Sequence, residues 1–212
     1  MSSLQERYVE ALLAGEMAEA VGLVEAAAAT GAEVRTVYLD VLQPALYEIG
    51  RRWEEAEISV AQEHLATATT QSLMARLSER LGNGGVGRRE RTALAACAEG
   101  ELHALGMRMV ADFLEADGWD VLFVGALSPV SAVVDLAQAR AVDVVAISAA
   151  LPDRVPEVTA AVQALRALDP APLVAVGGQA FGGEESFALA TGADLFALDA
   201  EQLTRELAVR FA

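Results

Sequence analysis

The sequence predicts an all-α part followed by an α/β part: a four-helix bundle, then a doubly wound, five-stranded parallel sheet of the Rossmann-like or flavodoxin-like kind. Two observations predict it. In the first 80 residues, apolar side chains recur at spacings of three and four, as in amphipathic helices. Beyond residue 91, short apolar runs alternate with helical segments, the pattern of parallel strands covered on both faces. The expected boundaries are a helical domain at 1–81, a linker at 82–90 and an α/β domain at 91–212.

Four helices are expected in the first domain because glycine and turn-forming residues break the apolar pattern at three places. These breaks are Gly15, Thr30 with Gly31, and residues 55–57. The helices then span residues 3–13, 17–29, 33–54 and 58–81. An antiparallel bundle is the simplest way to bury their apolar stripes. The glycine-rich, then basic segment GNGGVGRRER that follows favours a linker.

Five apolar runs predict the strands of the second domain. They lie at residues 92–96, 121–124, 142–147, 173–176 and, more weakly, 195–197. A helix is expected after each run. The helices should begin near Leu102, Pro129, Val155, Glu184 and Glu201. This alternation predicts an open sheet with helices on both faces.

Composition excludes several classes of protein. With 15 basic and 31 acidic residues the net charge is -16, which disfavours direct contact with nucleic acid or anionic lipid. All basic residues are arginines, so chemistry that needs a lysine is excluded. Cys97 is the sole cysteine, which excludes an intramolecular disulfide, and no long uncharged apolar run is present. We therefore expect a cytoplasmic protein without a membrane span.

Candidate binding residues follow the predicted strands, where doubly wound sheets bind their ligands. Glu101, His103 and Gly106 follow the first predicted strand, and Ser148 follows the third. Gly177 and Gly178 follow the fourth. A carboxylate two residues before a histidine can hold one ring nitrogen while the other binds a metal. Taken singly, a histidine or a glycine pair can equally have a structural role.

Together these residues resemble the cobalamin-binding signature D-x-H-x-x-G…S-x-L…G-G. The resemblance implies that His103 is the lower axial ligand of cobalt, replacing the dimethylbenzimidazole base. It also implies that the freed nucleotide tail lies beside Ser148, Gly177 and Gly178. Glu101 stands in place of the aspartate and Ala150 in place of the leucine. The longer glutamate can reach His103 directly or through a water molecule.

The helical domain resembles a narrower family. Trp53, nine residues and then Glu63 with His64 resemble the W-x9-E-H pattern of adenosylcobalamin photoreceptors, the sensor half of light-dependent repressors of carotenoid synthesis. The resemblance implies adenosylcobalamin bound base-off/His-on between bundle and sheet, with Trp53, Glu63 and His64 around the adenosyl group. An indole can stack on that group, and a carboxylate and an imidazole can bond to ribose and adenine. The alternative is that Trp53 and His64 only stabilise the bundle.

One difference from that family concerns the upper side of cobalt. Its founding members have a histidine directly after the tryptophan, where this chain has Glu54. After photolysis three outcomes are open. His64 could bind the upper side of cobalt, water could bind there, or the protein could release cobalamin. Glu63 is expected to offer His64 a competing hydrogen bond. The DNA-binding helix-turn-helix of the family is not expected, since the helical domain is predicted to begin at residue 1.

These features predict a cobalamin-binding light sensor rather than an enzyme. Photolysis of the cobalt–carbon bond would change conformation or association and signal to a protein partner, such as a transcription regulator, or through self-association. The alternative is a corrinoid shuttle protein of a methyltransferase system, for which methylcobalamin would be natural. Shuttle proteins resemble one another in a V-G-x-x-F-x-x-G stretch that residues 48–53 follow only in part.

Overall fold

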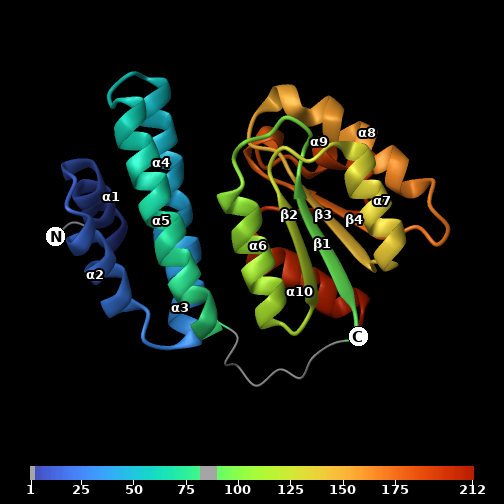
Figure 1. Ribbon diagram of the computed structural model, residues 1–212, viewed down its shortest axis with the longest axis horizontal. Coiled ribbons are helices and arrows are strands. Elements are labelled where there is room, and N and C mark those ends of the chain that lie inside the picture. Colours follow the sequence, from blue (N-terminus) through green and yellow to red (C-terminus); the bar gives the residue numbers. More distant parts are fainter. Residues whose placement is uncertain (1–2, 82–89) are drawn as a thin grey trace. The chain divides into compact units, whose positions relative to one another are not determined.

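The computed structural model describes residues 3–81 and 90–212. The chain divides into two compact units, residues 1–85 and 86–212, each described here by itself (Figure 1). We call them the cap unit and the sheet unit. The expected linker, except for its last residue, Glu90, lies outside the described residues.

The cap unit is entirely helical in its described part. Its first two helices begin and end close to the predicted positions, and a capping box of Ser3 with Glu6 fixes the start of the first. A second capping box, of Thr30 with Glu33, starts the third helix. The helices are α1 (Leu4–Ala14), α2 (Met17–Ala27), α3 (Gly31–Val37), α4 (Gln43–Glu54) and α5 (Val60–Leu81).

The helix predicted at 33–54 is interrupted. A π-helical turn, Tyr38–Leu42, separates α3 from α4. Pro44 supplies the reason, because a proline lacks an N–H and its ring would clash with the carbonyl four residues earlier in a regular α-helix. In the wider turn the Gln43 N–H donates to the Tyr38 carbonyl instead. The described part of the cap unit therefore contains five α-helices rather than the four predicted.

Two buried tyrosines form hydrogen bonds between α5 and other helical segments of the cap unit. The hydroxyl of Tyr8 on α1 lies 2.9 Å from that of Thr70, and the hydroxyl of Tyr38 donates to the Met74 carbonyl at 3.0 Å. Both rings are fully buried. The cap unit also buries the apolar side chains of Leu12, Val24, Leu42, Ile49, Leu73 and Leu77.

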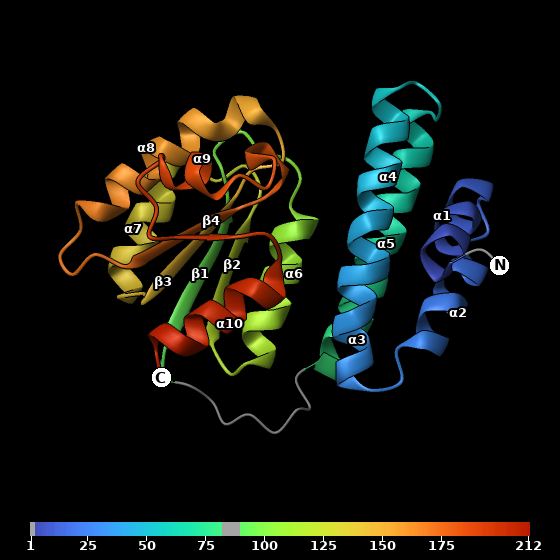
Figure 2. The same cartoon turned by 180° about the vertical axis from the view of Figure 1, so that it is seen from behind.

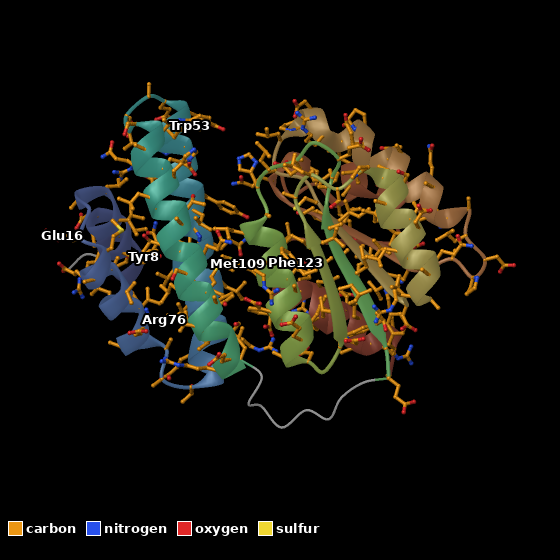
Figure 3. All side chains as sticks on the ribbon, viewed as in Figure 1. Tyr8, Glu16, Trp53, Arg76, Met109 and Phe123 are labelled. Carbon is orange, nitrogen blue, oxygen red and sulfur yellow. The ribbon has the colours of Figure 1, made fainter. Side chains whose placement is uncertain are left out.

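The turn between α4 and α5 closes in a left-handed conformation. Ala56 has φ of +58°, and the N–H of Glu57 donates to the Arg52 carbonyl at 2.8 Å. This is a Schellman-type helix end in which alanine stands at the position that usually favours glycine. The turn fixes where Trp53, near the end of α4, lies relative to the start of α5 (Figure 3).

The sheet unit is the predicted parallel sheet. Its strands are β1 (Thr92–Cys97), β2 (Asp120–Gly125), β3 (Val144–Ser148), β4 (Leu173–Gly177) and β5 (Leu195–Ala197). All pairs are parallel and the order is β2-β1-β3-β4-β5, the flavodoxin-like arrangement. The change of direction between β1 and β3 places the ligand edge of such a fold at the ends of these two strands.

Helices cover both faces of the sheet, as Figures 1 and 2 show. One face packs on α6 (Leu105–Ala116) and α10 (Ala200–Arg210). The other packs on α7 (Val130–Arg140), α8 (Val155–Arg166) and the short α9 (Glu185–Leu189). The neighbouring strand residues Val144 and Val145 point to opposite faces and are both fully buried, so both faces of the sheet are apolar.

One helix begins later than predicted. The pattern placed the start of α6 near Leu102, whereas the helix begins at Leu105. The Glu101 carboxylate accepts the N–H groups of Leu102 and His103, and such local bonds compete with helix formation. None of the helices in residues 3–81 and 90–212 combines the length and the apolar content that a membrane span requires.

Candidate functional site

The predicted site residues of the sheet unit meet at the carboxyl edge of the sheet. Cys97 at the end of β1 pairs with Ser148, and Ser148 pairs with Gly177. The loop that carries Glu101 and His103 follows directly after β1. Three segments far apart in the sequence thus form one edge, as the doubly wound pattern predicts.

Glu101 organises this edge. Its carboxylate is almost fully buried, with 1% of the side chain exposed. One oxygen accepts from the N–H groups of Leu102 and His103 at 2.8 and 2.9 Å and from His103 Nδ1 at 2.5 Å. The other accepts from the Ala150 N–H at 2.9 Å and so ties the loop after β1 to the loop after β3. The longer glutamate therefore reaches His103 directly.

Electrostatics keep this buried carboxylate charged. Burial by itself would raise the pKa of Glu101. The hydrogen bonds from the backbone of His103 and Ala150 and from the His103 ring outweigh burial, so the pKa lies below its ordinary value. The site thus offers its histidine an ionised partner.

His103 presents the other side of its ring outward. Because Glu101 engages Nδ1, Nε2 is the nitrogen left to bind a metal, and 58% of the side chain is exposed. A carboxylate on the remote ring nitrogen fixes the tautomer and raises the basicity of the ligating one. The donor set therefore fits a metal cofactor that takes one imidazole ligand from the protein.

The glycines of the site differ in whether the surrounding backbone leaves room for a side chain. A side chain at Gly177 would place Cβ 2.6 Å from the Ala197 carbonyl oxygen, and one at Gly178 would lie 2.2 Å from that of Ala149. Both glycines are thus required by the approach of the protein's own backbone. At Gly106, in the first turn of α6, only neighbouring residues of the chain and the helix's own backbone approach the position that a Cβ would take, so open space lies beside it.

Ser148 has a modest local role. Its hydroxyl lies 3.7 Å from Cys97 Sγ, and its carbonyl accepts from the Ala98 N–H at 2.9 Å. Burial raises the pKa of the Cys97 thiol to about 11, so this thiol is uncharged at neutral pH. The side chains of Ser148 and Cys97 line the end of β1 and β3 with small neutral groups.

Sequence reasoning missed two features of this edge. The Ala150 N–H, which holds Glu101, could not be singled out because backbone donors leave no signature in the side-chain pattern. Exposed leucines also follow the strands, and Leu127 has φ of +59°, a strained conformation for a bulky residue. The sequence feature that could have indicated them is an apolar residue in the loop after a predicted strand. The exposed leucines are Leu102, Leu127, Leu151 and Leu198.

The predicted residues of the cap unit lie at the α4–α5 end of that unit. Trp53, 45% exposed, is not a buried core residue (Figure 3). On α5, the Glu63 carboxylate lies 2.5 Å from His64 Nδ1 and accepts from the Thr67 hydroxyl at 2.8 Å. His64 is 75% exposed. Thr67 lies four residues after Glu63 on α5, and nothing in the sequence pattern singled out its bond to Glu63.

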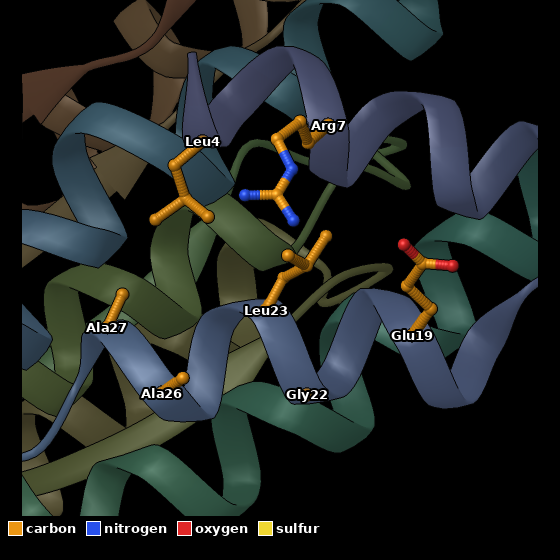
Figure 4. A pocket seen from close by; sticks show the side chains of 7 residues that line it. All are labelled: Leu4, Arg7, Glu19, Gly22, Leu23, Ala26 and Ala27. Atoms are coloured by element: carbon orange, nitrogen blue, oxygen red, sulfur yellow. The ribbon is translucent and has the colours of Figure 1, made fainter. Parts of the chain in front are cut away.

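A shallow groove between α1 and α2 contains none of the predicted site residues (Figure 4). Arg7 and Glu19 flank it, and its floor consists of small and apolar side chains. Its lining shares no residue with the histidine pairs, so we do not connect it with the candidate site.

A carboxylate-held histidine at the ligand edge of a doubly wound sheet is an arrangement that fits a cofactor-binding module. Family models described as a B12 binding domain match residues 4–78 and 91–208. The second match spans more than half of the chain, and the chain therefore belongs to the B12-binding family, whose ligand is cobalamin.

Similar proteins fall into two groups. The chain is 37% identical over 139 residues to the HTH-type transcriptional repressor CarA of Myxococcus xanthus, covering 65% of this chain and 45% of the repressor. It is 30% identical over 122 residues to monomethylamine corrinoid protein 1 of Methanosarcina mazei, covering 57% and 56%. It thus spans about half the length of the curated relatives it matches. These names describe a repressor and a corrinoid protein.

The fold is also shared with a solved structure. The Methanosarcina barkeri monomethylamine corrinoid protein superposes with a TM-score of 0.79 at 21% identity, covering 97% of this chain and 98% of that chain. At this identity the match concerns the fold alone.

Proposed function

We propose that this chain is a cobalamin-binding light sensor that holds adenosylcobalamin base-off/His-on. The observation that carries the proposal is the Glu101–His103 pair, in which a buried carboxylate fixes Nδ1 and leaves Nε2 exposed. Nε2 is the atom that would bind cobalt as the lower axial ligand. Adenosylcobalamin, when bound, supplies a cobalt–carbon bond that visible light cleaves.

The sheet unit would bind the lower side of the cofactor. Glu101 orients His103, and Gly106 leaves open space at the start of α6. Ser148, Gly177 and Gly178 end the strands where the nucleotide tail is expected. The small neutral side chains there impose no charge on an uncharged base, which supports this placement.

The cap unit would contact the adenosyl group. Trp53 is exposed enough to stack on a bulky ligand, and Glu63 and His64 present hydrogen-bonding atoms on one face of α5. Loss of the adenosyl group would remove these contacts. A ligand shifts a conformational equilibrium only by the contacts it makes differently in the two states, and these are such contacts.

The signal would pass to another protein, such as a transcription regulator, or through self-association. The net charge of -16 opposes direct binding to nucleic acid or to an anionic membrane surface. A protein partner with a basic surface is compatible with that charge.

The second candidate is a corrinoid shuttle protein of a methyltransferase system, with methylcobalamin as cofactor. It is favoured by the similarity to monomethylamine corrinoid proteins in sequence. The cap distinguishes the two, since a shuttle must expose the upper face of cobalt to partner enzymes. Bulky contacts from Trp53 and His64 would hinder that exposure.

The response of the loaded protein to light distinguishes these two functions. The full chain is loaded with adenosylcobalamin, and absorbance and hydrodynamic size are recorded in the dark and after green light. A sensor is expected to bind adenosylcobalamin more tightly than methylcobalamin and to change size or partner binding after light. A preference for methylcobalamin, with no change of size or partner binding, would favour the shuttle.

A further inference from the structure

Two charged side chains at the ligand edge of the sheet unit have buried atoms without a hydrogen-bond partner. Arg154 ends the short turn after β3, and Glu157 lies in the first turn of α8. Arg154 Nε and Glu157 Oε2 are both buried, and neither forms a hydrogen bond within the described part of the chain. Buried polar groups are normally paired, because an unpaired one loses its contact with water and gains nothing in return. Both groups are therefore suited to a partner from outside the chain.

Arg154 packs against the loop that carries the histidine of the site. A Cβ on Gly100 would lie 3.0 Å from Arg154 Nη1 and 3.5 Å from Cζ, so the guanidinium contacts the backbone of that glycine. Gly100 has φ of +78° and directly precedes Glu101, which holds His103. The contact between Arg154 and the neighbouring Asp153 is long, at 3.4 Å, and this carboxylate is 66% exposed. Arg154 is thus fixed beside the site but only weakly paired.

The second group lies close to the first. Arg154 and Glu157 are three residues apart, and this spacing makes two side chains neighbours on a helix surface. Arg154 is the N-cap residue of α8 and has helical backbone angles, so the spacing applies here. Their charges are opposite, yet the buried Nε and Oε2 do not bond to each other. A guanidinium donor and a carboxylate acceptor are therefore neighbours, and each can take a further partner.

A primary carboxamide is the chemical group that matches such a pair. Its carbonyl oxygen accepts from a guanidinium, and its NH2 group donates to a carboxylate. A carboxylate ligand would be attracted by Arg154 but repelled by Glu157, and an ammonium ligand would show the reverse. Cobalamin carries primary amides around the rim of its corrin ring. The cofactor of this family thus bears the group that the two side chains together would select.

We propose that Arg154 and Glu157 together bind one corrin carboxamide, an inference that rests on the cobalamin binding in the proposed function. The guanidinium donates to the amide oxygen, and the carboxylate accepts from the amide nitrogen. Since 29% of the Arg154 side chain is exposed, a molecule bound at this edge can reach it. All residues of this subsite belong to the sheet unit. The pair selects the fully amidated cofactor and acts separately from the ligation of cobalt by His103.

The test compares aquacobalamin with its monocarboxylic acids, in which one corrin amide is replaced by a carboxylate, on the full chain. Wild type is expected to bind one of these acids roughly tenfold more weakly than aquacobalamin, because the new carboxylate faces Glu157. Glu157→Gln should abolish that difference. Arg154→Met, which keeps the length of the side chain and removes the donors, should weaken aquacobalamin binding by roughly tenfold.

A matched control lies at the opposite edge of the sheet. Arg140, in the last turn of α7, is 3.9 Å from Asp120 at the start of β2. Arg140→Met removes the same charge as Arg154→Met but far from the ends of the strands where the cofactor is expected. It should bind aquacobalamin and every monocarboxylic acid as wild type does.

Stability without cofactor separates binding from a structural role. Arg154→Met and Glu157→Gln should leave the midpoint of urea denaturation unchanged or raise it, because each removes a buried group that has no partner in the fold. If the pair served only the fold, both variants should lower the midpoint and bind the amide and acid forms as wild type does.

The inference is overturned if wild type binds all the monocarboxylic acids as tightly as aquacobalamin, or if Arg154→Met and Glu157→Gln both bind as wild type does. In that case retention of aquacobalamin by wild type, with the absorbance bands of an imidazole-ligated cobalt, leaves the proposed function standing. If wild type does not retain aquacobalamin or lacks these bands, the proposed function itself fails, and the inference fails with it.

Discussion

The two glutamate–histidine pairs have the same contact but differ in how they are anchored. The Glu101 carboxylate is 1% exposed and accepts three backbone N–H groups besides the ring of His103. The Glu63 carboxylate is 23% exposed and is held by one side-chain hydroxyl besides His64. The first pair is therefore fixed by the backbone, and the second can move by rotation of side chains.

The largest expected difference is in stability. Glu101→Ala leaves the buried N–H groups around it without an acceptor, at a cost of about 3 kcal/mol or more in the free energy of unfolding. Glu63→Ala should cost under about 1 kcal/mol, because water can reach its partners. Urea denaturation of both variants without cofactor measures this. Similar losses would show that the two anchors are alike.

The second largest effect is expected on cofactor affinity, when the histidine of the first pair is replaced. His103→Ala is expected to weaken cobalamin binding by at least roughly tenfold, because the lower ligand is lost. The stability without cofactor should stay close to wild type, since His103 is 58% exposed. Titration followed by absorbance gives the affinity. An unchanged affinity and spectrum would remove His103 from the site.

A smaller effect is expected from the tryptophan of the cap unit. Trp53→Ala should reduce the preference for adenosylcobalamin over methylcobalamin and aquacobalamin by a few-fold, because a cavity no longer discriminates a bulky ligand from a small one. Competition among the three cobalamins measures this preference. If the preference is unchanged, Trp53 has only a structural role and the shuttle function gains support.

The smallest effect concerns the turn beside the second pair. Ala56→Gly removes the penalty of a left-handed alanine, about 1 kcal/mol, and part of this gain is offset by the flexibility of glycine in the unfolded chain. A net gain of about 0.5 kcal/mol is expected in urea denaturation. Ala141→Gly, at the left-handed end of α7, is the matched variant in the sheet unit. A loss of stability in Ala56→Gly alone would indicate that this turn is not strained.

Much of the site followed from local patterns. His103 could be predicted as a candidate because Glu101 lies two residues before it and both follow a strand. Glu63 and His64 were singled out by resemblance, because their spacing from Trp53 is similar to a pattern of adenosylcobalamin photoreceptors. The interruption at Tyr38–Leu42 was not predicted, because Pro44 leaves the spacing of the apolar residues around it unchanged. Local pattern therefore located the residues but not the details of the backbone.

The sequence by itself determined the alternation of strands and helices, the helical nature of the cap unit and the residues at the strand ends. It could do so because periodicity and turn chemistry act over a few residues. Only the tertiary structure decided the strand order, the Ala150 N–H that holds Glu101 from 49 residues away and the ring nitrogen that each glutamate engages. These depend on backbone groups and side-chain rotamers brought together by packing, which leave no trace in the order of residue types.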